Sequence, residues 1–239
     1  MKYRELNGLI IHHHNLGEAD RIITIFSLQE GKIRAVAKGV RRAKAKLAGH
    51  LEPFTMCDIR LTKGRNLDII IGAQAKKIYD FSGLGSQSLQ TAYLVLEAVG
   101  RLSAEAEPNE LAYYLIIEVF EALLGGYNPL LVRQYFGLRF LASIGSQPEL
   151  TDTKLGQHHY LVYGSGQIAR TKPQGHYGII SVATIKLWRL ILSHQLPDLA
   201  RLKNIEEALK EGETLLMRYY EYHFDITFKS TKVFQADDL

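Results

Sequence analysis

Apolar and polar residues alternate through much of the first 80 residues, a pattern typical of half-buried β-strands. Two β-branched runs, 7–14 and 20–27, are separated by turn-forming residues and predict a hairpin. A third strand is predicted from Gly31, and apolar or alternating runs at 52–61 and 67–78 complete a set of five. Five short strands with a long connection between the third and the fourth predict an OB-type β-barrel.

From residue 86 the apolar residues recur every three or four positions, which is the spacing of amphipathic helices. Residues 146–180 interrupt this pattern with glycines, prolines and short β-like pieces, and predict a small β-hairpin insert. The predicted class is therefore α+β, with an OB-fold domain at 1–80 and an α-helical domain at 81–239. Helices are predicted from 86 to about 100, over 111–124, from Asn128 to Gly145, from Ser181 to His194 and from Asn204 towards Phe224.

Charge is divided unevenly between these two parts. Residues 1–80 hold 15 Lys and Arg against 8 Asp and Glu, whereas the remainder holds 14 against 17. Seven cations lie between positions 32 and 46, with no acid among them: Lys32, Arg34, Lys38, Arg41, Arg42, Lys44 and Lys46. Such a strand and loop are typical of binding to a nucleic-acid backbone, helped by Lys63 and Arg65 in the next predicted loop. The alternative is a solvated loop with a chance excess of cations.

Composition excludes several other classes. The single cysteine, Cys57, argues against a disulfide framework and against a cysteine-rich zinc site, and it fits a reducing compartment. No apolar run approaches the roughly 18 residues of a membrane span, and the first residues lack the apolar core of a signal peptide. We therefore expect a cytoplasmic protein without a membrane partner.

Patterns of common active sites are missing from the sequence. No Gly-x-x-x-x-Gly-Lys-Ser/Thr phosphate loop occurs, so nucleotide hydrolysis is not expected. Glu18 and Asp20 lie in one turn beside Arg21, which favours a salt bridge over a metal-dependent nuclease site. His12 and His14 would share a face of a strand, but no further ligand accompanies them. The sequence predicts no catalytic residue, no metal and no cofactor.

Several short motifs follow one another between residues 8 and about 75. They are Gly17-Glu18-Ala19-Asp20-Arg21-Ile22, Phe26, Gly31-Lys32, Ala35 to Arg42, Leu47-Ala48-Gly49 and Leu51-Glu52-Pro53-Phe54. Together they resemble the N-terminal half of the RecO family of recombination mediator proteins. The resemblance implies an OB fold followed by a helical domain. It also implies a non-catalytic role in DNA repair: binding single- and double-stranded DNA, annealing complementary strands, and acting with RecR to load RecA onto strands coated by single-strand-binding protein.

The same resemblance implies partner sites. The helical domain would receive the acidic, aromatic C-terminal tail of single-strand-binding protein, with Arg133 and Arg139 supplying charge and Phe136 an apolar contact. Alternatively, Arg133 and Arg139 are ordinary surface arginines on a helix whose other face packs in the core. The OB domain would take part in contacts to RecR.

Many family members carry a zinc ribbon with two Cys-x-x-Cys pairs in the region equivalent to 146–180. Here that region contains no cysteine, so we expect a zinc-ribbon-like insert without metal. His158, His159 and His176 are poor substitutes, because adjacent histidines on a strand point to opposite faces.

Two other functions remain open on the sequence alone. An OB-fold RNA-binding protein of translation or ribosome assembly would show the same basic barrel, and would prefer structured RNA to single-stranded DNA. A nucleic-acid-processing enzyme would require a divalent metal and would turn its substrate over.

Overall fold

The computed structural model describes residues 3–150 and 159–230 of the 239-residue chain. These form two compact units, one of residues 1–84 with 92–114 and the other of residues 85–91 with 115–239. Two helices, α1 (Ser86–Leu102) and α2 (Glu110–Leu124), contribute to both units. Among the described helices, none has the length and apolar content required to cross a membrane. The domain boundary expected at residue 80 stays a prediction.

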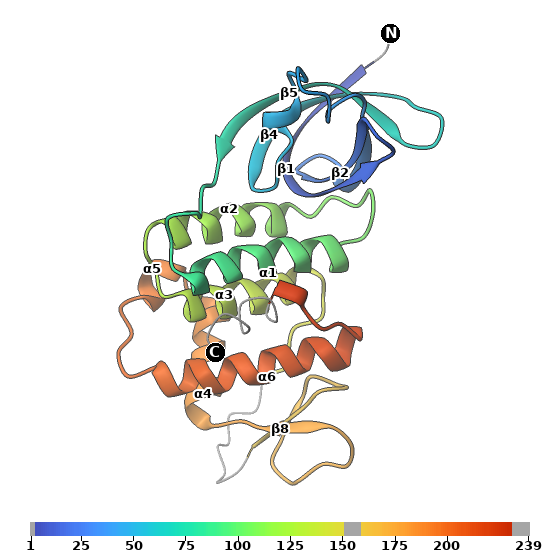
Figure 1. Ribbon diagram of the computed structural model, residues 1–239. Coiled ribbons are helices and arrows are strands. Elements are labelled where there is room, and N and C mark those ends of the chain that lie inside the picture. The colour runs from blue at the N-terminus through green and yellow to red at the C-terminus, as the bar shows by residue number, and fades with distance from the viewer. Residues whose placement is uncertain (1–2, 151–158, 231–239) are drawn as a thin grey trace. The chain divides into compact units, whose positions relative to one another are not determined.

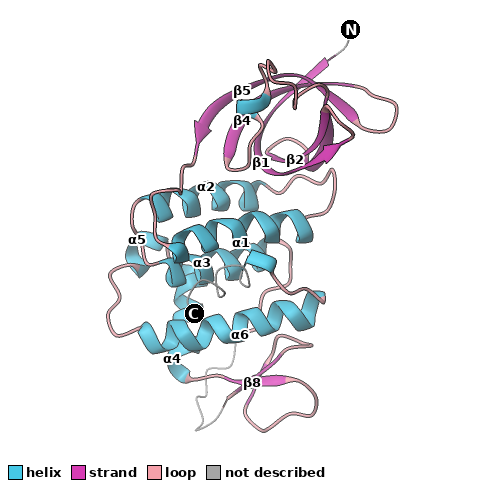
Figure 2. Cartoon of the chain, viewed as in Figure 1, coloured by secondary structure: helices cyan, strands magenta, loops and turns pink. Residues whose placement is uncertain are grey.

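The first unit contains the expected β-barrel (Figures 1 and 2). Its strands close in the order β1-β2-β3-β5-β4, and the 3-10 helix η1 (Ala48–His50) lies in the connection between β3 and β4. Alternate residues of β2, β3 and β4 point inward, and isoleucine and leucine fill most of the interior. The prediction of a five-stranded OB-type barrel is confirmed. The strands are β1 (Tyr3–Leu16), β2 (Asp20–Ser27), β3 (Gly31–Ala37), β4 (Thr55–Thr62) and β5 (Asp68–Ile78).

Strand pairing decides which loops meet at each end of the barrel. β2 runs antiparallel to both β1 and β3, so the β1–β2 turn and the β3–β4 connection share one end. β5 begins beside the middle of β3, where Asp68 lies opposite Ala35, and it runs parallel to β3. The loop between β4 and β5 therefore enters β5 from the side of the first residues of β3, away from the end at which the β3–β4 connection begins.

The second unit is built on α3 (Pro129–Ser143), α4 (Val182–Ser193) and α6 (Glu206–Phe224), which pack against one another. A one-turn helix, α5 (Leu196–Leu199), follows α4. Trp188 is fully buried and donates from Nε1 to Gln134 Oε1 at 2.9 Å. Gly212 permits this approach, because a Cβ there would lie 2.8 Å from the indole nitrogen.

The N-caps of α3 and α4 agree with the sequence, whereas that of α6 does not. Asn128 accepts from the amides of Leu130 and Leu131, and Ser181 accepts from that of Thr184, as the cap preferences predict. The sequence predicts that this helix begins at Asn204, but Ile205 takes the N-cap position of α6 and makes no side-chain cap. Asn204 instead has a φ of 58°, a left-handed conformation that asparagine tolerates better than most residues.

The insert is a three-stranded sheet rather than a single hairpin. Strands β6 (Tyr160–Val162), β7 (Ile168–Ala169) and β8 (Tyr177–Ile179) pair in the order β7-β6-β8. The additional strand, β8, follows the loop 170–176 and pairs with β6. The local sequence pattern does not predict this pairing. Residues 151–158, where the family's first cysteine pair would begin and which include His158, lie outside the described residues.

Gly31, at the start of β3, is the glycine whose replacement should be most costly in the first unit. Its φ is 65°, and a Cβ there would lie 1.9 Å from the Glu107 carbonyl oxygen. Gly31→Ala should lower the free energy of unfolding by about 2–4 kcal/mol, because left-handed backbone and overpacking both cost energy. Urea unfolding measures the difference. Gly17→Ala is the matched control, because Gly17 has a φ of 60° with nothing within 4 Å, so a similar loss in both variants would contradict this account.

Candidate nucleic-acid interface

The connection that follows β3 carries five exposed cations: Lys38, Arg41, Arg42, Lys44 and Lys46. We call residues 38–46 the basic loop. Its alanines are small, so long side chains extend away from the chain, while Val40 is buried in the barrel core. Leu47 packs against the same core and Leu51 is fully buried. The loop is therefore pinned at both ends by apolar residues, with its cations directed to solvent.

The turn between β1 and β2 braces the basic loop. The amide of Gly39, with a φ of 65°, donates to Asp20 Oδ1 at 2.7 Å. The amide of Arg41 donates to the Ala19 carbonyl at 3.0 Å, and the Arg41 guanidinium donates to the Gly17 carbonyl at 2.8 Å. Residues 17–22, the first of the short motifs named in the sequence analysis, therefore hold the start of the basic loop in place.

A second brace joins β1, β2 and the connection that leads into β4. Glu52 accepts from Arg21 at 2.7 Å and lies 2.9 Å from His13 Nε2. Burial opposes ionisation of this carboxyl, but the hydrogen bonds from Arg21 and His13 prevail and lower the pKa of Glu52. Arg21 therefore pairs with Glu52 and not with Asp20, the partner suggested by their adjacency. Within the described residues, no group of three or more His, Cys, Asp or Glu side chains could hold a metal.

The two cations on β3 itself have internal partners. β3 alternates as expected, with Ile33, Ala35 and Ala37 inside and Lys32 and Arg34 outside. Lys32 Nζ donates to the Gly100 carbonyl at 3.0 Å, and burial lowers the pKa of this amine. The Arg34 guanidinium pairs with Glu105 at 3.1 Å. Sequence reasoning missed Glu105, which lies 71 positions from Arg34.

Lys63 and Arg65 are exposed on the β4–β5 loop, toward the other end of the barrel. The nine predicted cations therefore fall into three groups: five on the basic loop, two on β3, and two on the β4–β5 loop. Within the described residues, the side chains of Lys38, Arg42, Lys44 and Lys46 make no hydrogen bond or ion pair, and neither do those of Lys63 and Arg65. The basic loop is the densest of these groups.

Aromatic residues add little stacking surface near these cations. Phe26 is fully buried, and Phe54 is 8% exposed with its ring edge-on to Phe81 and Tyr93. Tyr3 is exposed, but Arg60 already lies over its ring, 5.8 Å from the centroid. Phe26 and Phe54 are therefore core residues.

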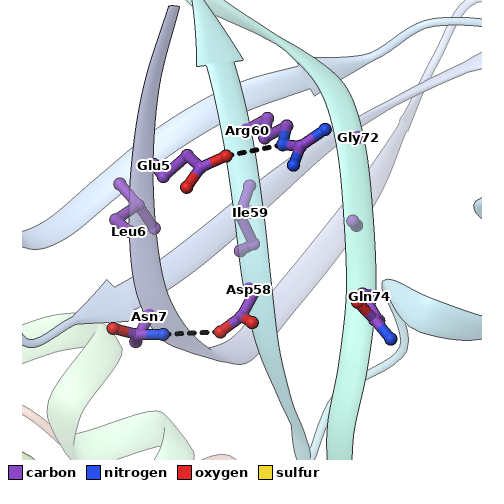
Figure 3. Close-up of a pocket in the computed structure, with 9 residues that line it drawn as sticks. Glu5, Leu6, Asn7, Asp58, Ile59, Arg60, Gly72 and Gln74 are labelled. Carbon is purple, nitrogen blue, oxygen red and sulfur yellow. Dashed lines mark hydrogen bonds and ion pairs between the residues drawn. The ribbon is translucent and has the colours of Figure 1, made fainter.

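A groove of about 400 Å³ crosses the outer face of β1, β4 and β5 (Figure 3). Its polar side chains satisfy one another, since Arg60 donates to Glu5 at 2.6 Å and Asn7 donates to Asp58 at 2.5 Å. Lys76 pairs with Asp58 at 2.7 Å. The groove therefore lacks the excess positive charge that a phosphate backbone requires.

The helical unit places the three residues expected to bind a partner tail in different environments. Phe136 is fully buried and stacks on Phe140, with ring centroids 5.2 Å apart. Arg133 is 5% exposed and pairs with Glu213 at 2.7 Å. Arg139 is half-buried and donates to the carbonyls of α4 at Ile191 and of His194. The expectation that Phe136 and Arg133 face a peptide needs correction, because both side chains lie inside the unit.

Comparison with known proteins gives one consistent family. A family model described as "Recombination protein O N terminal" matches residues 1–79, and one described as "Recombination protein O C terminal" matches residues 88–232. A protein named DNA repair protein RecO from Nocardioides sp. is 33% identical over 245 residues, covering 96% of this chain and 98% of the relative. Proteins of the same name from Dehalococcoides mccartyi (31% identical, 86% and 85% covered) and Desulforamulus reducens (26%, 97% and 94%) are also similar.

Proposed function

The chain belongs to the RecO family of DNA repair proteins, and we propose on that premise that its basic loop binds the phosphate backbone of single- and double-stranded DNA. The observation that carries this proposal is a loop with five exposed cations and no acid, pinned to the mouth of an OB-type barrel. Lysine and arginine separated by alanine suit binding to an extended polyanion, because their long side chains are not used for packing and can extend to the phosphates. Lys63 and Arg65 would extend the contact along the barrel.

Binding of this kind is insensitive to sequence. Each neutralised phosphate releases condensed counterions, and that release supplies most of the free energy of non-specific binding. Phosphate contacts position a strand without reading its bases. Two complementary strands held on one basic surface repel each other less, so base pairing can begin between them. This accounts for strand annealing without ATP and without a catalytic group, and the proposal includes no enzymatic step and no cofactor.

The wider role follows from the family and not from particular contacts. We infer that the protein acts with RecR to load RecA on DNA coated by single-strand-binding protein, in the cytoplasm and at the nucleoid. The OB domain is expected to meet RecR. Of the residues considered for the tail of single-strand-binding protein, only Arg139 has part of its side chain at the surface of the helical unit. We therefore keep Arg139 as the proposed contact to the acidic tail.

A salt titration of a fluorescent single-stranded oligonucleotide tests the proposal. Single-stranded DNA contributes a log–log slope of about −0.7 per phosphate contact, so engagement of four or more loop cations predicts a slope near −3 or steeper. Unlabelled structured RNA should compete less well than single-stranded DNA of the same length. A preference for structured RNA, or a slope near zero, would overturn the proposal.

A further inference from the structure

The segment that follows α1 lies along the edge of β3 at Lys32, ahead of the residues that pair with β5. We call residues 103–107 the acidic segment, since its only charged residues are Glu105 and Glu107. Glu105 forms an isolated parallel bridge with Lys32, and the amide of Ala106 donates to the Lys32 carbonyl at 2.8 Å. The acidic segment thus adds a short strand-like piece to the sheet at the point where the basic strand begins.

Backbone geometry shows how closely the acidic segment approaches β3. The space beside Gly31 is filled by the Glu107 carbonyl, so only a residue without a Cβ fits there. Ala106 has a φ of 56°, which alanine adopts only at an energetic cost that the surrounding contacts must offset. The Lys32 amine also bonds to α1, which precedes this segment, because it donates to the Gly100 carbonyl. The placement of this segment is therefore specific.

The Glu105 carboxylate occupies the place beside Arg34 that a phosphate group of DNA could take. The Glu105 carboxylate lies 3.1 Å from the Arg34 guanidinium, with both of its oxygens near the same terminal nitrogen. A phosphate offers the same kind of anionic oxygens and forms the same charge-assisted hydrogen bonds. Without Glu105, Arg34 would extend the cations of the basic loop along β3 towards Lys63 and Arg65.

We propose that the acidic segment is an internal competitor for DNA, with Glu105 holding the phosphate-binding position at Arg34. This inference rests on the proposed binding of DNA by the barrel and describes how that binding is limited. The Arg34 and Glu105 side chains are 48% and 56% exposed, and ion pairs so accessible to water are weak. An incoming phosphate can therefore exchange with the carboxylate, and the exchange moderates affinity so that a bound strand is released more readily.

The test compares Glu105→Gln with Glu107→Gln. Both changes remove one negative charge from the same segment, but only Glu105 pairs with Arg34. Glu105→Gln should tighten binding of a fluorescent single-stranded oligonucleotide about threefold to fivefold at low salt, as expected for release of one exposed ion pair. It should also steepen the log–log salt slope by about 0.7, one additional phosphate contact. Glu107→Gln should leave the slope unchanged.

Arg34→Gln provides the second arm of the test. In an Arg34→Gln background, Glu105→Gln should no longer steepen the slope, because the contact that it releases is missing. Equal slopes for Glu105→Gln and Glu107→Gln would overturn the inference while leaving DNA binding by the basic loop in place. Failure of the unmodified protein to bind the oligonucleotide would instead overturn the proposed function, and the competition with it.

Discussion

Replacing Arg41, Arg42, Lys44 and Lys46 together by alanine is expected to abolish most of the salt dependence of DNA binding. Loss of four contacts at about 0.7 each should make the log–log slope shallower by roughly 2 to 3. At 0.1 M salt the same relation corresponds to an affinity loss of about two orders of magnitude or more. A fluorescent oligonucleotide titrated at several salt concentrations measures both quantities.

The structure makes this a change of charge and not of fold. The four side chains are exposed, and within the described part of the chain the only hydrogen bond that any of them makes runs from Arg41 to the Gly17 carbonyl. Val40 and Leu51, which pin the loop to the barrel, are untouched. The variant should therefore unfold in urea close to the unmodified midpoint, with a change within about 1 kcal/mol.

A matched control removes the same charge from the helical unit. Lys172, Lys186, Lys203 and Lys210 are exposed and make no ion pair within the described residues, so their joint replacement by alanine should leave the slope near its original value. Equal slopes for the unmodified protein and the loop variant would mean that the basic loop is only a solvated surface. The DNA site would then have to be sought on the helical unit.

Arg133→Met is expected to cause the largest loss of stability in the helical unit, about 3–5 kcal/mol. The Arg133 guanidinium is buried and donates to Glu213, to Thr91 Oγ1 at 3.0 Å and to Gln90 Oε1 at 3.0 Å. Removing it leaves the Glu213 carboxylate largely desolvated without its counter-charge. One oxygen of that carboxylate, Oε2, already lacks a hydrogen-bond partner among the described atoms.

Urea unfolding measures the effect, and a double variant isolates its cause. Arg133→Met with Glu213→Leu replaces the charged pair by apolar side chains and should recover most of the loss, as buried pairs often do. If Arg133→Met alone costs less than about 1 kcal/mol, the pair is effectively solvated, and Arg133 could serve a partner after all.

The sequence predicted those parts of the structure that depend on local pattern. Alternation along Gly31–Ala37 located the outward cations of β3, and side-chain oxygens located the caps at Asn128 and Ser181. Val36 shares the outer face with Arg34, because a regular strand alternates strictly. The basic loop was recognisable because its charge is contiguous in the chain.

Contacts between distant residues could not be predicted. The sequence shows that Arg133 lies among apolar residues of a predicted helix. It does not show that Glu213 on α6 is the partner that allows Arg133 to be buried. The partner of Arg34 lies beyond a whole helix, and the third strand of the insert depends on pairing between Tyr160 and Ile179. In each case the sequence around one of the two partners is that of an ordinary surface residue, so it gives no sign of the contact.

The pinning of the basic loop by Val40 and Leu51 also bears on the entropy of association. A loop that is disordered before binding must give up backbone freedom of about 1–2 kcal/mol per residue when it is ordered by a ligand. Here folding of the barrel has already restricted the loop, so the ordering cost on binding falls mainly on the nucleic acid and on the tips of the lysine and arginine side chains. The protein therefore presents a preorganised surface on which the flexible partner is the strand.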